Sequence, residues 1–352
     1  MIEPFSSTLL HWYDIHKREL PWRNETDPYK IWISEIILQQ TRVAQGWDYY
    51  LRFIERFPDV KSIYESGEQE VLKYWQGLGY YTRARNIYAG AAYIMEKHSG
   101  IFPQNYSEIL EIKGVGEYTA AAIASLAFHL PHAVIDGNVL RVCTRYFGIY
   151  EAVDSSAGKK KISEMVNQLI DKQHPDLFNQ AMMDFGATQC TPQHPDCEKC
   201  CFSATCFANL HFEQANLPVK NHKTKTRNRY FYYLHIQYNN LIYIQKRQAD
   251  DIWKGLFEFP LLETDAILSE ENLVNHPFLN KLFKKKHWQI VKISPVFKHV
   301  LSHQIITATF VGIIIENKLQ TTDFLCISKN DWSNYPVSRL MEKFIEKFES
   351  NQ

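Results

Sequence analysis

The chain lacks any long apolar run, and its N-terminus lacks the features of a signal peptide. No apolar stretch approaches the roughly 20 residues that a membrane-spanning helix needs, and residues 1–20 form an amphipathic segment that carries charges. Paired disulfide spacing is also absent, which favours a reducing compartment. We therefore expect a cytoplasmic protein with no membrane partner.

The formal net charge is zero, because 39 Lys and Arg residues balance 39 Asp and Glu residues. A neutral chain argues weakly against a nucleic-acid partner. The charges are divided unevenly, however: 20 basic and 26 acidic residues precede position 219, and 19 basic and 13 acidic residues follow. A basic C-terminal part suits a polyanion, but a charge of this size is equally common on a solvated surface. Both interpretations stay open.

With no internal repeat or low-complexity tract, the 352 residues suffice for two or three domains. Apolar residues at i, i+3 and i+4 predict an all-helical part, 1–218, with helices over 29–50, 68–75, 82–97, 118–128, 139–147 and 160–169. Polar, basic residues 219–228 predict a linker. Beyond them, an α+β domain, 229–352, is predicted, with strands over 230–238, 241–245 and 305–315 and a helix over 339–348.

Four of the seven cysteines follow the pattern C-x6-C-x2-C-x5-C, at Cys190, Cys197, Cys200 and Cys206. Four thiolates suit zinc or an iron–sulfur cluster. Structural zinc usually uses two C-x2-C pairs, and only one is present, so the spacing favours [4Fe–4S] while zinc and the absence of metal remain alternatives. Cys201 is interpreted as a bystander, and Cys143 and Cys326 as core residues.

Two glycines, Gly114 and Gly116, flank Val115 just before a predicted helix. Glycine lets successive backbone amides point outward, and amides at a helix N-terminus bind phosphate. The pattern therefore suggests a helix-hairpin-helix that grips a DNA backbone without reading sequence. A simple tight turn is the alternative.

Two carboxylates are candidates for acid–base chemistry. Asp136 follows an apolar run and precedes a helix, so its position alone favours an N-cap. Glu35 lies in a helix with Trp32 and Leu38 on the same face. Burial would raise its pKa and keep it available as an acid, whereas a surface position at a helix edge is an equal alternative.

Two further segments present polar or aromatic side chains. Residues 39–41, Gln-Gln-Thr, are expected to continue the helix of Glu35, and residues 77–81, Gly-Leu-Gly-Tyr-Tyr, predict a turn that displays aromatic rings. Amides and aromatic rings are suitable wedges for a DNA stack. Capping and core packing are the alternatives.

Taken together, these motifs make the chain similar to the MutY-type adenine DNA glycosylases of the helix-hairpin-helix superfamily that includes endonuclease III. The resemblance covers essentially the whole chain. Its motifs are Leu20–Arg23, Ser34–Glu35, Leu38–Thr41, Gly77–Tyr81, Gly114–Ala120, Asp136–Val139, the four cysteines, Trp253–Pro260 and Leu301–His303.

The resemblance implies an all-α glycosylase body with an iron–sulfur loop and a C-terminal Nudix-like domain that recognises 8-oxoguanine. The body would have a six-helix module at about 22–132, and a [4Fe–4S]-bearing module from the N-terminus and about 133–218. The implied activity is excision of adenine opposite 8-oxoguanine or guanine in double-stranded DNA, by base flipping in base excision repair. We expect a monomer associated with the bacterial nucleoid.

The resemblance also implies residue roles. Glu35 would protonate the leaving base, Asp136 would support the oxocarbenium-like sugar, and Tyr118 and Asn138 would assist beside it. Gly114, Val115 and Gly116 would hold the DNA backbone. The implied substrate contacts are Trp22, Arg23, Gln40, Thr41, Leu78, Tyr80, Gln180, Leu301, Ser302 and His303.

Three departures from related proteins are visible, and the first two narrow the expected activity. Lyase-active relatives carry a nucleophilic Lys where Tyr118 stands, and tyrosine forms no Schiff base. The C-terminal domain contains no Nudix box, which argues against phosphate-ester hydrolysis. The lesion loop commonly begins with Phe, whereas Leu301 stands here. The rival hypotheses are a lyase-active glycosylase for oxidised pyrimidines and a non-enzymatic DNA-binding scaffold.

Overall fold

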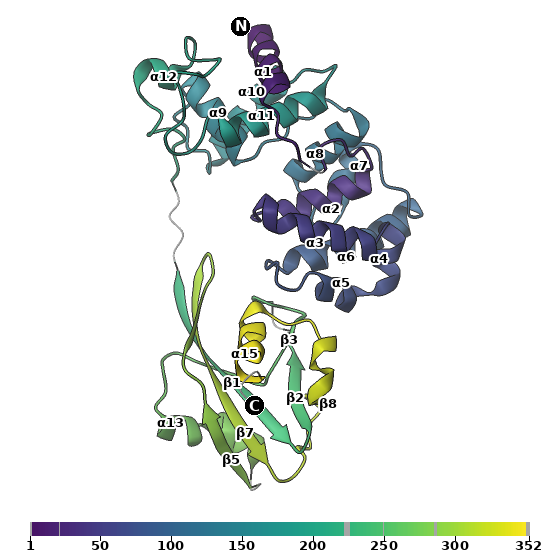
Figure 1. Cartoon of the computed structure of the whole chain (residues 1–352), viewed down its shortest axis with the longest axis vertical. Coiled ribbons are helices and arrows are strands. Elements are labelled where there is room, and N and C mark those ends of the chain that lie inside the picture. The colour runs from purple at the N-terminus through teal and green to yellow at the C-terminus, as the bar shows by residue number, and fades with distance from the viewer. Residues whose placement is uncertain (1, 21, 222–225, 249, 285–286, 350–352) are drawn as a thin grey trace. The chain divides into compact units, whose positions relative to one another are not determined.

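The computed structural model describes residues 2–20, 22–221, 226–248, 250–284 and 287–349 (Figure 1). The chain divides into two compact units, one of residues 1–65 and 86–222 and the other of residues 66–85 and 223–352. The second unit thus includes a short segment that lies within the helical part of the sequence.

The helices confirm the prediction of a helical first part. They are α1 (Ile2–His16), α2 (Pro28–Leu38), α3 (Val43–Arg56), α4 (Val60–Ser66), α5 (Glu68–Tyr74), α6 (Thr82–His98), α7 (Tyr106–Glu111), α8 (Glu117–Phe128), α9 (Gly137–Phe147), α10 (Ser156–Leu169), α11 (Pro175–Thr188) and α12 (Phe207–His211). Helix α5 and the first residues of α6 belong to the second unit. No helix in the described ranges is long and apolar enough to cross a membrane.

The expectation of one helix over 29–50 is wrong. Helix α2 ends at Leu38, and α3 begins only at Val43. Between them Gln40 has a φ of +56°, a left-handed backbone that ends α-helical hydrogen bonding. Gln39 and Gln40 therefore lie on a turn between two helices, and their side chains do not follow the helical spacing.

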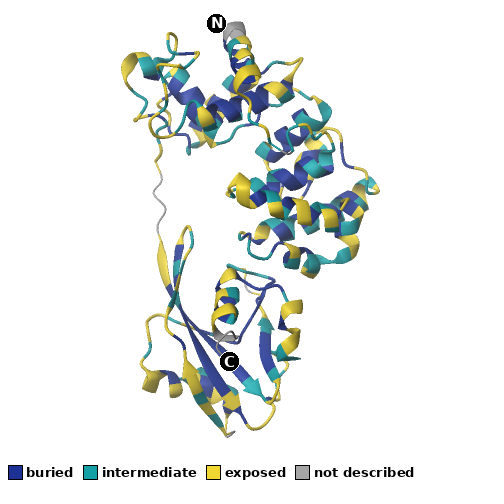
Figure 2. Cartoon of the chain, viewed as in Figure 1, coloured by how far each residue is buried: buried dark blue, intermediate teal, exposed yellow. Residues whose placement is uncertain are grey.

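One hydrophobic core of the first unit lies where α1, α9, α10 and α11 pack together (Figure 2), and α2 and α8 bury apolar side chains against each other. Helix α11 was missed from the sequence, although its buried residues Phe178, Ala181, Met182 and Phe185 follow a helical spacing. The predicted core position of Cys143 is confirmed, since it is fully buried here.

The second unit is built on an eight-stranded sheet. Its strands are β1 (Arg227–Tyr238), β2 (Leu241–Lys246), β3 (Phe257–Glu258), β4 (Leu261–Thr264), β5 (Trp288–Ile293), β6 (Phe297–Val300), β7 (Gln304–Ile315) and β8 (Leu325–Ser328). The central order is β3-β2-β1-β7-β5, with β1 and β7 parallel; β4 also pairs with β1, β6 with β7, and β8 with β2. The predicted strands are thereby confirmed. Residues 222–225 of the expected linker lie outside the described residues, and β1 begins within its end.

Both faces of this sheet are covered. Alternate residues of β1 point to opposite sides: Phe231 and Tyr233 join a core with η1 (Lys329–Asn334) and α15 (Arg339–Glu349), the predicted C-terminal helix. Tyr232 and Leu234 join a second core with α13 (Glu270–Val274) and α14 (Pro277–Phe283). Cys326, which was predicted to be a core residue, is only partly buried and packs against this second core.

Candidate active site

A cavity of about 130 Å³ lies in the first unit between α2, α8, α11 and the segment before α2. It collects several residues that were predicted from separate motifs. Its lining includes Trp22, Arg23, Glu35, Tyr118 and Gln180, together with Arg18, Leu20, Glu25, Leu38, Val43, Leu126, Met183 and Asp184.

Glu35 projects from α2 into this cavity and meets Tyr118 from α8. The Tyr118 hydroxyl donates a hydrogen bond to Oε2 of Glu35 at 2.8 Å. Burial raises the pKa of Glu35 above its ordinary value, and the charge of Asp136 raises it further, while the Tyr118 hydrogen bond and Arg23 act in the opposite direction. Burial and the neighbouring Glu35 also raise the pKa of Tyr118, which therefore remains a hydrogen-bond donor.

Asp136 is held rigidly at the start of α9. Its Oδ1 accepts from the backbone N–H groups of Asn138 and Val139, each at 2.8 Å, so the N-cap interpretation is confirmed. Its Oδ2 accepts from the Asn138 side-chain amide at 2.7 Å. Arg141 fixes that amide, because it donates to Asn138 Oδ1 at 2.8 Å and to the carbonyl of Cys190 at 2.8 Å.

A buried carboxylate that the sequence did not reveal organises the other wall. Asp184 on α11 is fully buried and accepts from Arg18 Nε at 2.9 Å and from Arg23 Nη2 at 2.6 Å. Oε1 of Gln180 accepts from Arg23 at 3.1 Å and from Tyr13 at 2.8 Å. Since both donors reach the oxygen, the Gln180 amide nitrogen is left as the group that can donate into the cavity.

Nε of Arg23 is buried without a partner and lies beside the same cavity. A buried donor left unpaired is costly unless a ligand or water satisfies it. Trp22 packs against Trp47 and Tyr50, with ring centroids 5.6 and 6.3 Å away. The cavity therefore combines an aromatic wall with donors for a planar polar ligand.

The glycine hairpin has the expected tight geometry. Gly114 has a φ of +83°, and an added Cβ would lie 2.4 Å from Cβ of Asn86, so only glycine fits. Gly116 is the N-cap of α8. Both glycines are exposed, whereas Val115 is buried in the protein.

The predicted wedge residues differ in exposure. Gln40 is exposed, and Tyr80, in the second unit, is 49% exposed with a φ of +49°. Thr41 is half-buried, and its hydroxyl lies 3.4 Å from the Gln39 carbonyl. Leu78 is only 7% exposed and packs into the protein. Left-handed backbone at non-glycine residues is strained and tends to occur at functional positions.

The loop 301–303 joins β6 and β7 in the second unit. Ser302 and His303 are exposed, whereas Leu301 is half-buried and packs against the domain core. The hydroxyl groups of Tyr80 and Ser302 lie 3.2 Å apart, so one wedge candidate meets one lesion-loop candidate.

The four cysteines of the predicted metal site, Cys190, Cys197, Cys200 and Cys206, all line one small cavity of about 30 Å³. Protein donors face their sulfur atoms, including Arg145 at 3.5 Å from Cys190 and Gln214 at 3.7 Å from Cys197. Cys201 is exposed. Four sulfurs that line one cavity, with protein donors facing two of them, are consistent with an iron–sulfur cluster.

Two known families match separate ranges of this chain. Residues 33–171 match the HhH-GPD superfamily of base excision DNA repair proteins, and residues 231–347 match the NUDIX domain. The adenine DNA glycosylase of Buchnera aphidicola subsp. Baizongia pistaciae is 37% identical over 365 residues, covering 99% of this chain and 98% of that protein. The chain belongs to the adenine DNA glycosylase family. The resemblance deduced from the motifs is thereby confirmed.

Other adenine DNA glycosylases are also similar to this chain. That of Buchnera aphidicola subsp. Acyrthosiphon pisum is 33% identical over 354 residues, covering 99% of this chain and 98% of that one. The human protein is 38% identical over 225 residues, covering 61% of this chain and 41% of its own length. This adenine DNA glycosylase is therefore a hydrolase of N-glycosyl bonds in base excision repair, and its family implies a DNA substrate.

Solved structures bear out the helical fold. A thermostable thymine-DNA glycosylase superposes with a TM-score of 0.56 at 32% identity, over 60% of this chain and 97% of that one. Endonuclease III trapped covalently on DNA superposes with a TM-score of 0.53 over 60% of this chain and 98% of that one. At 22% identity, the latter shows the fold alone.

Proposed function

We propose that this glycosylase excises adenine paired opposite 8-oxoguanine or guanine, with Glu35 as the acid that protonates the leaving base. The observation that carries the proposal is the Glu35–Tyr118 pair in the cavity, together with the raised pKa of Glu35. A carboxylic acid kept neutral by burial can donate a proton where an exposed glutamate would be ionised.

Asp136 supplies the second carboxylate. Cleavage of an N-glycosidic bond builds positive charge on the sugar, which a nearby anion stabilises, as in glycoside hydrolysis. The three hydrogen bonds to Asp136 keep its oxygens in place while that charge develops. Glu35, as a neutral acid, would protonate the base, and Asp136, as a fixed carboxylate, would stabilise the charge on the sugar.

The flipped adenine would enter the cavity against Trp22, where the Arg23 and Gln180 donors can meet acceptors on its edge. The backbone amides of the 114–116 hairpin would hold a DNA phosphate. Gln40 and Tyr80 would occupy the space left in the stack, since both are exposed on strained turns. Thr41 and Leu78 would support these two turns.

Strand cleavage is not part of the proposed activity. Tyr118 offers a phenol in place of an amine, and Lys113 lies on the exposed surface before the hairpin. A lyase would need an amine beside the sugar to form a Schiff base. Borohydride trapping on the same duplex checks this point, since a monofunctional enzyme yields no covalent adduct.

The four cysteines would hold a [4Fe–4S] cluster. Arg145, Gln214 and the Phe202 N–H face the sulfur atoms and would tune such a group through hydrogen bonds. The cluster would shape the loop between α11 and α12, and base removal needs only the two carboxylates.

The lesion on the opposite strand would be read by Ser302 and His303. A hydroxyl and an imidazole offer both donors and acceptors for groups that guanine lacks. Leu301 packs into its own domain, whereas Ser302 and His303 are exposed and would be accessible to DNA.

The test is adenine release from a duplex with one 8-oxoguanine:adenine pair, under single-turnover conditions. Glu35→Gln should slow release by about 10²–10⁴, the usual worth of a positioned acid, and should leave DNA binding intact. Glu25→Gln is the matched control: Glu25 lines the same cavity, but its carboxylate faces Lys30 and backbone amides. Near-normal release by Glu35→Gln rejects the acid assignment, and no release by the unaltered chain favours a scaffold.

A further inference from the structure

Ser302 and His303 in the loop 301–303 are exposed. The backbone of the loop must therefore be fixed by contacts other than those of these two side chains. Leu301 N donates to Gln304 O at 2.8 Å, and Arg227 N donates to His303 O at 3.1 Å. The first bond ends at Gln304, the first residue of β7, and the second joins the loop to Arg227, the first residue of β1. Recognition by an exposed loop requires that its supporting backbone be fixed. The geometry of the loop therefore depends on what fixes Gln304.

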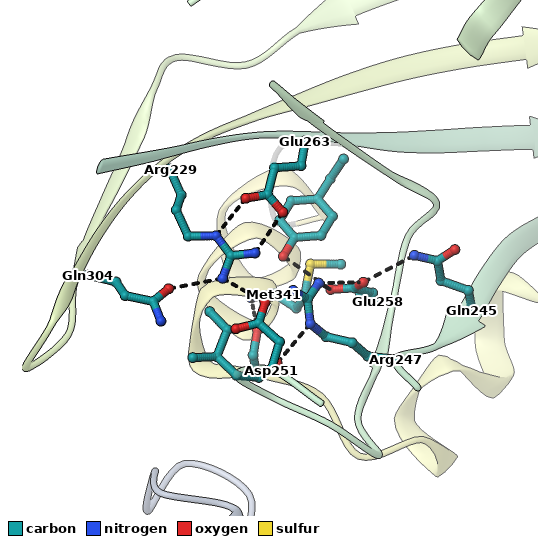
Figure 3. A network of polar contacts seen from close by, with 11 residues as sticks. Arg229, Gln245, Arg247, Asp251, Glu258, Glu263, Gln304 and Met341 are labelled. Carbon is teal, nitrogen blue, oxygen red and sulfur yellow. Dashed lines mark hydrogen bonds and ion pairs between the residues drawn. The ribbon is translucent and has the colours of Figure 1, made fainter. Parts of the chain in front are cut away.

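Gln304 is only 4% exposed, and its side chain points into a buried polar network (Figure 3). Its Oε1 accepts from Nη1 of Arg229 at 2.9 Å. Arg229, on β1, donates through Nε and Nη2 to the two oxygens of Glu263, each at 2.6 Å, and its Nη1 lies 2.7 Å from Asp251. Such a fork orients a guanidinium rigidly, so Gln304 is bound to an immobile group.

A second arginine completes the network. Arg247 lies 2.8 Å from Asp251 and 3.0 Å from Glu258. Both arginines also face the ring of Phe231, at 4.7 Å for Arg229 and 5.6 Å for Arg247. Arg229, Arg247, Glu258 and Gln304 are buried, whereas Asp251 and Glu263 are partly exposed. Paired buried members of a polar network favour one arrangement.

The network also reaches β6, the other strand of the hairpin. Asp251 precedes Trp253, whose backbone has a φ of +60° and whose ring lies 5.6 Å from that of His299 on β6. Arg247 Nε donates to the Ile252 carbonyl at 2.7 Å and fixes this turn. Both strands are therefore held, β7 through its first residue and β6 through Trp253.

We propose that Gln304 and Arg229 are positioning residues for discrimination of the lesion. Arg229, fixed by its carboxylates, holds Gln304 and thereby the backbone that presents Ser302 and His303 to the 8-oxoguanine strand. This inference rests on the proposed reading of 8-oxoguanine by that loop. It gives a specificity role to two buried residues.

The first experiment measures backbone order in the full chain without DNA. Gln304→Leu removes the acceptor and nearly conserves size, and Arg229 keeps both carboxylates. Amide hydrogen exchange of Leu301 and Arg227 should become faster. Gln304→Glu keeps an acceptor in place and should restore slow exchange.

The matched control is Gln245→Leu in the same network. Gln245 lies on β2 and donates to Glu258 Oε1 at 3.1 Å, away from the hairpin. Glu258 keeps its bonds to Arg247 and Tyr233 in this variant. Exchange of the loop amides should therefore stay slow.

The second experiment compares single-turnover adenine release from 8-oxoguanine:adenine and guanine:adenine duplexes. Gln304→Leu should reduce the rate ratio roughly tenfold or more, the worth of one good base contact, with little change on guanine:adenine. Gln304→Glu and Gln245→Leu should keep the ratio. The double variant Ser302→Ala, His303→Ala should lose the ratio.

The outcomes separate the two proposals. Unchanged exchange in Gln304→Leu, or an equal effect of Gln245→Leu, overturns the positioning role. A second outcome also overturns the positioning role: Gln304→Leu speeds exchange but keeps the rate ratio between the two duplexes, while the double variant loses that ratio. The loop would then read the lesion without support from Gln304. An intact ratio in the double variant overturns lesion reading by the loop itself, and the inference falls with it.

Discussion

At the scale of single residues, the hydroxyl of Tyr118 acts against the burial of Glu35. Burial raises the pKa of Glu35 and the charge of Asp136 adds to the rise, whereas the hydrogen bond from Tyr118 favours the carboxylate and lowers it. A general acid is most effective when its pKa lies near the working pH. Tyr118 thus limits how far burial can raise the pKa of Glu35.

Tyr118→Phe should therefore raise the pKa of Glu35 further. Glu35 is active when protonated, so the rate falls as pH rises through its pKa, and this basic limb should move to higher pH in the variant. Single-turnover pH–rate profiles measure the shift. Tyr93→Phe, which removes another tyrosine–glutamate hydrogen bond, to Glu111, should leave the limb in place. A limb that stays fixed or moves to lower pH in Tyr118→Phe would contradict this account.

At the scale of elements, local spacing predicted the longer strands and several of the helices, but it missed the short strands and did not show where one helix ends. The apolar repeat runs on from α2 into α3, so nothing in it marks the turn at Gln40. That turn is supported by a tertiary contact, Gln39 Nε2 to Thr119 Oγ1 at 3.3 Å, which joins residues 80 positions apart. Long-range contacts of this kind override local propensity and escape sequence reasoning.

The candidate site shows the same limit. Glu35 and Tyr118 could be given roles from the motifs, yet their hydrogen bond joins residues 83 positions apart and required the fold. Asp184 was not predicted at all, because α11 was missed and an isolated aspartate carries no motif. Its two arginine partners, Arg18 and Arg23, identify it only in three dimensions.

The cysteine loop between α11 and α12 leads to a prediction about metal content. The purified protein should be brown, with absorption near about 400 nm and roughly four irons per chain. Cys197→Ser should lower iron content, whereas Cys201→Ser, at the exposed neighbour of Cys200, should leave it unchanged. Metal analysis with absorbance spectra measures both. A colourless, active protein with stoichiometric zinc would disprove the cluster.

At the scale of the whole molecule, the second unit is discontinuous. Segment 66–85 is held to the C-terminal part by side-chain contacts with its backbone: Tyr81 donates to Val337 O at 3.1 Å, and Gln76 accepts from Val337 N at 3.2 Å. Gln76 also donates to Glu342 at 2.6 Å. A chain cut after residue 222 would lose these partners.

Removal of residues 223–352 should therefore loosen segment 66–85 selectively. Hydrogen exchange should become faster over this segment, because hydrogen bonds worth roughly 1 kcal/mol each are lost. Exchange in α9 and α10, whose core lies in the first unit, serves as the internal control. Equal exchange over 66–85 in the full and shortened chains would show that the first unit alone holds the segment.

The discontinuity also sets an order of events on the ribosome. Segment 66–85 leaves the exit tunnel before its partners, since 256 residues separate Tyr81 from Val337. At about 5–20 residues per second, Gln76 and Tyr81 wait roughly 13–50 s for Val337 to be translated. The nascent chain can complete the first unit in that interval, whereas the second can close only once Val337 has been translated, so segment 66–85 is open to chaperones and proteases until then.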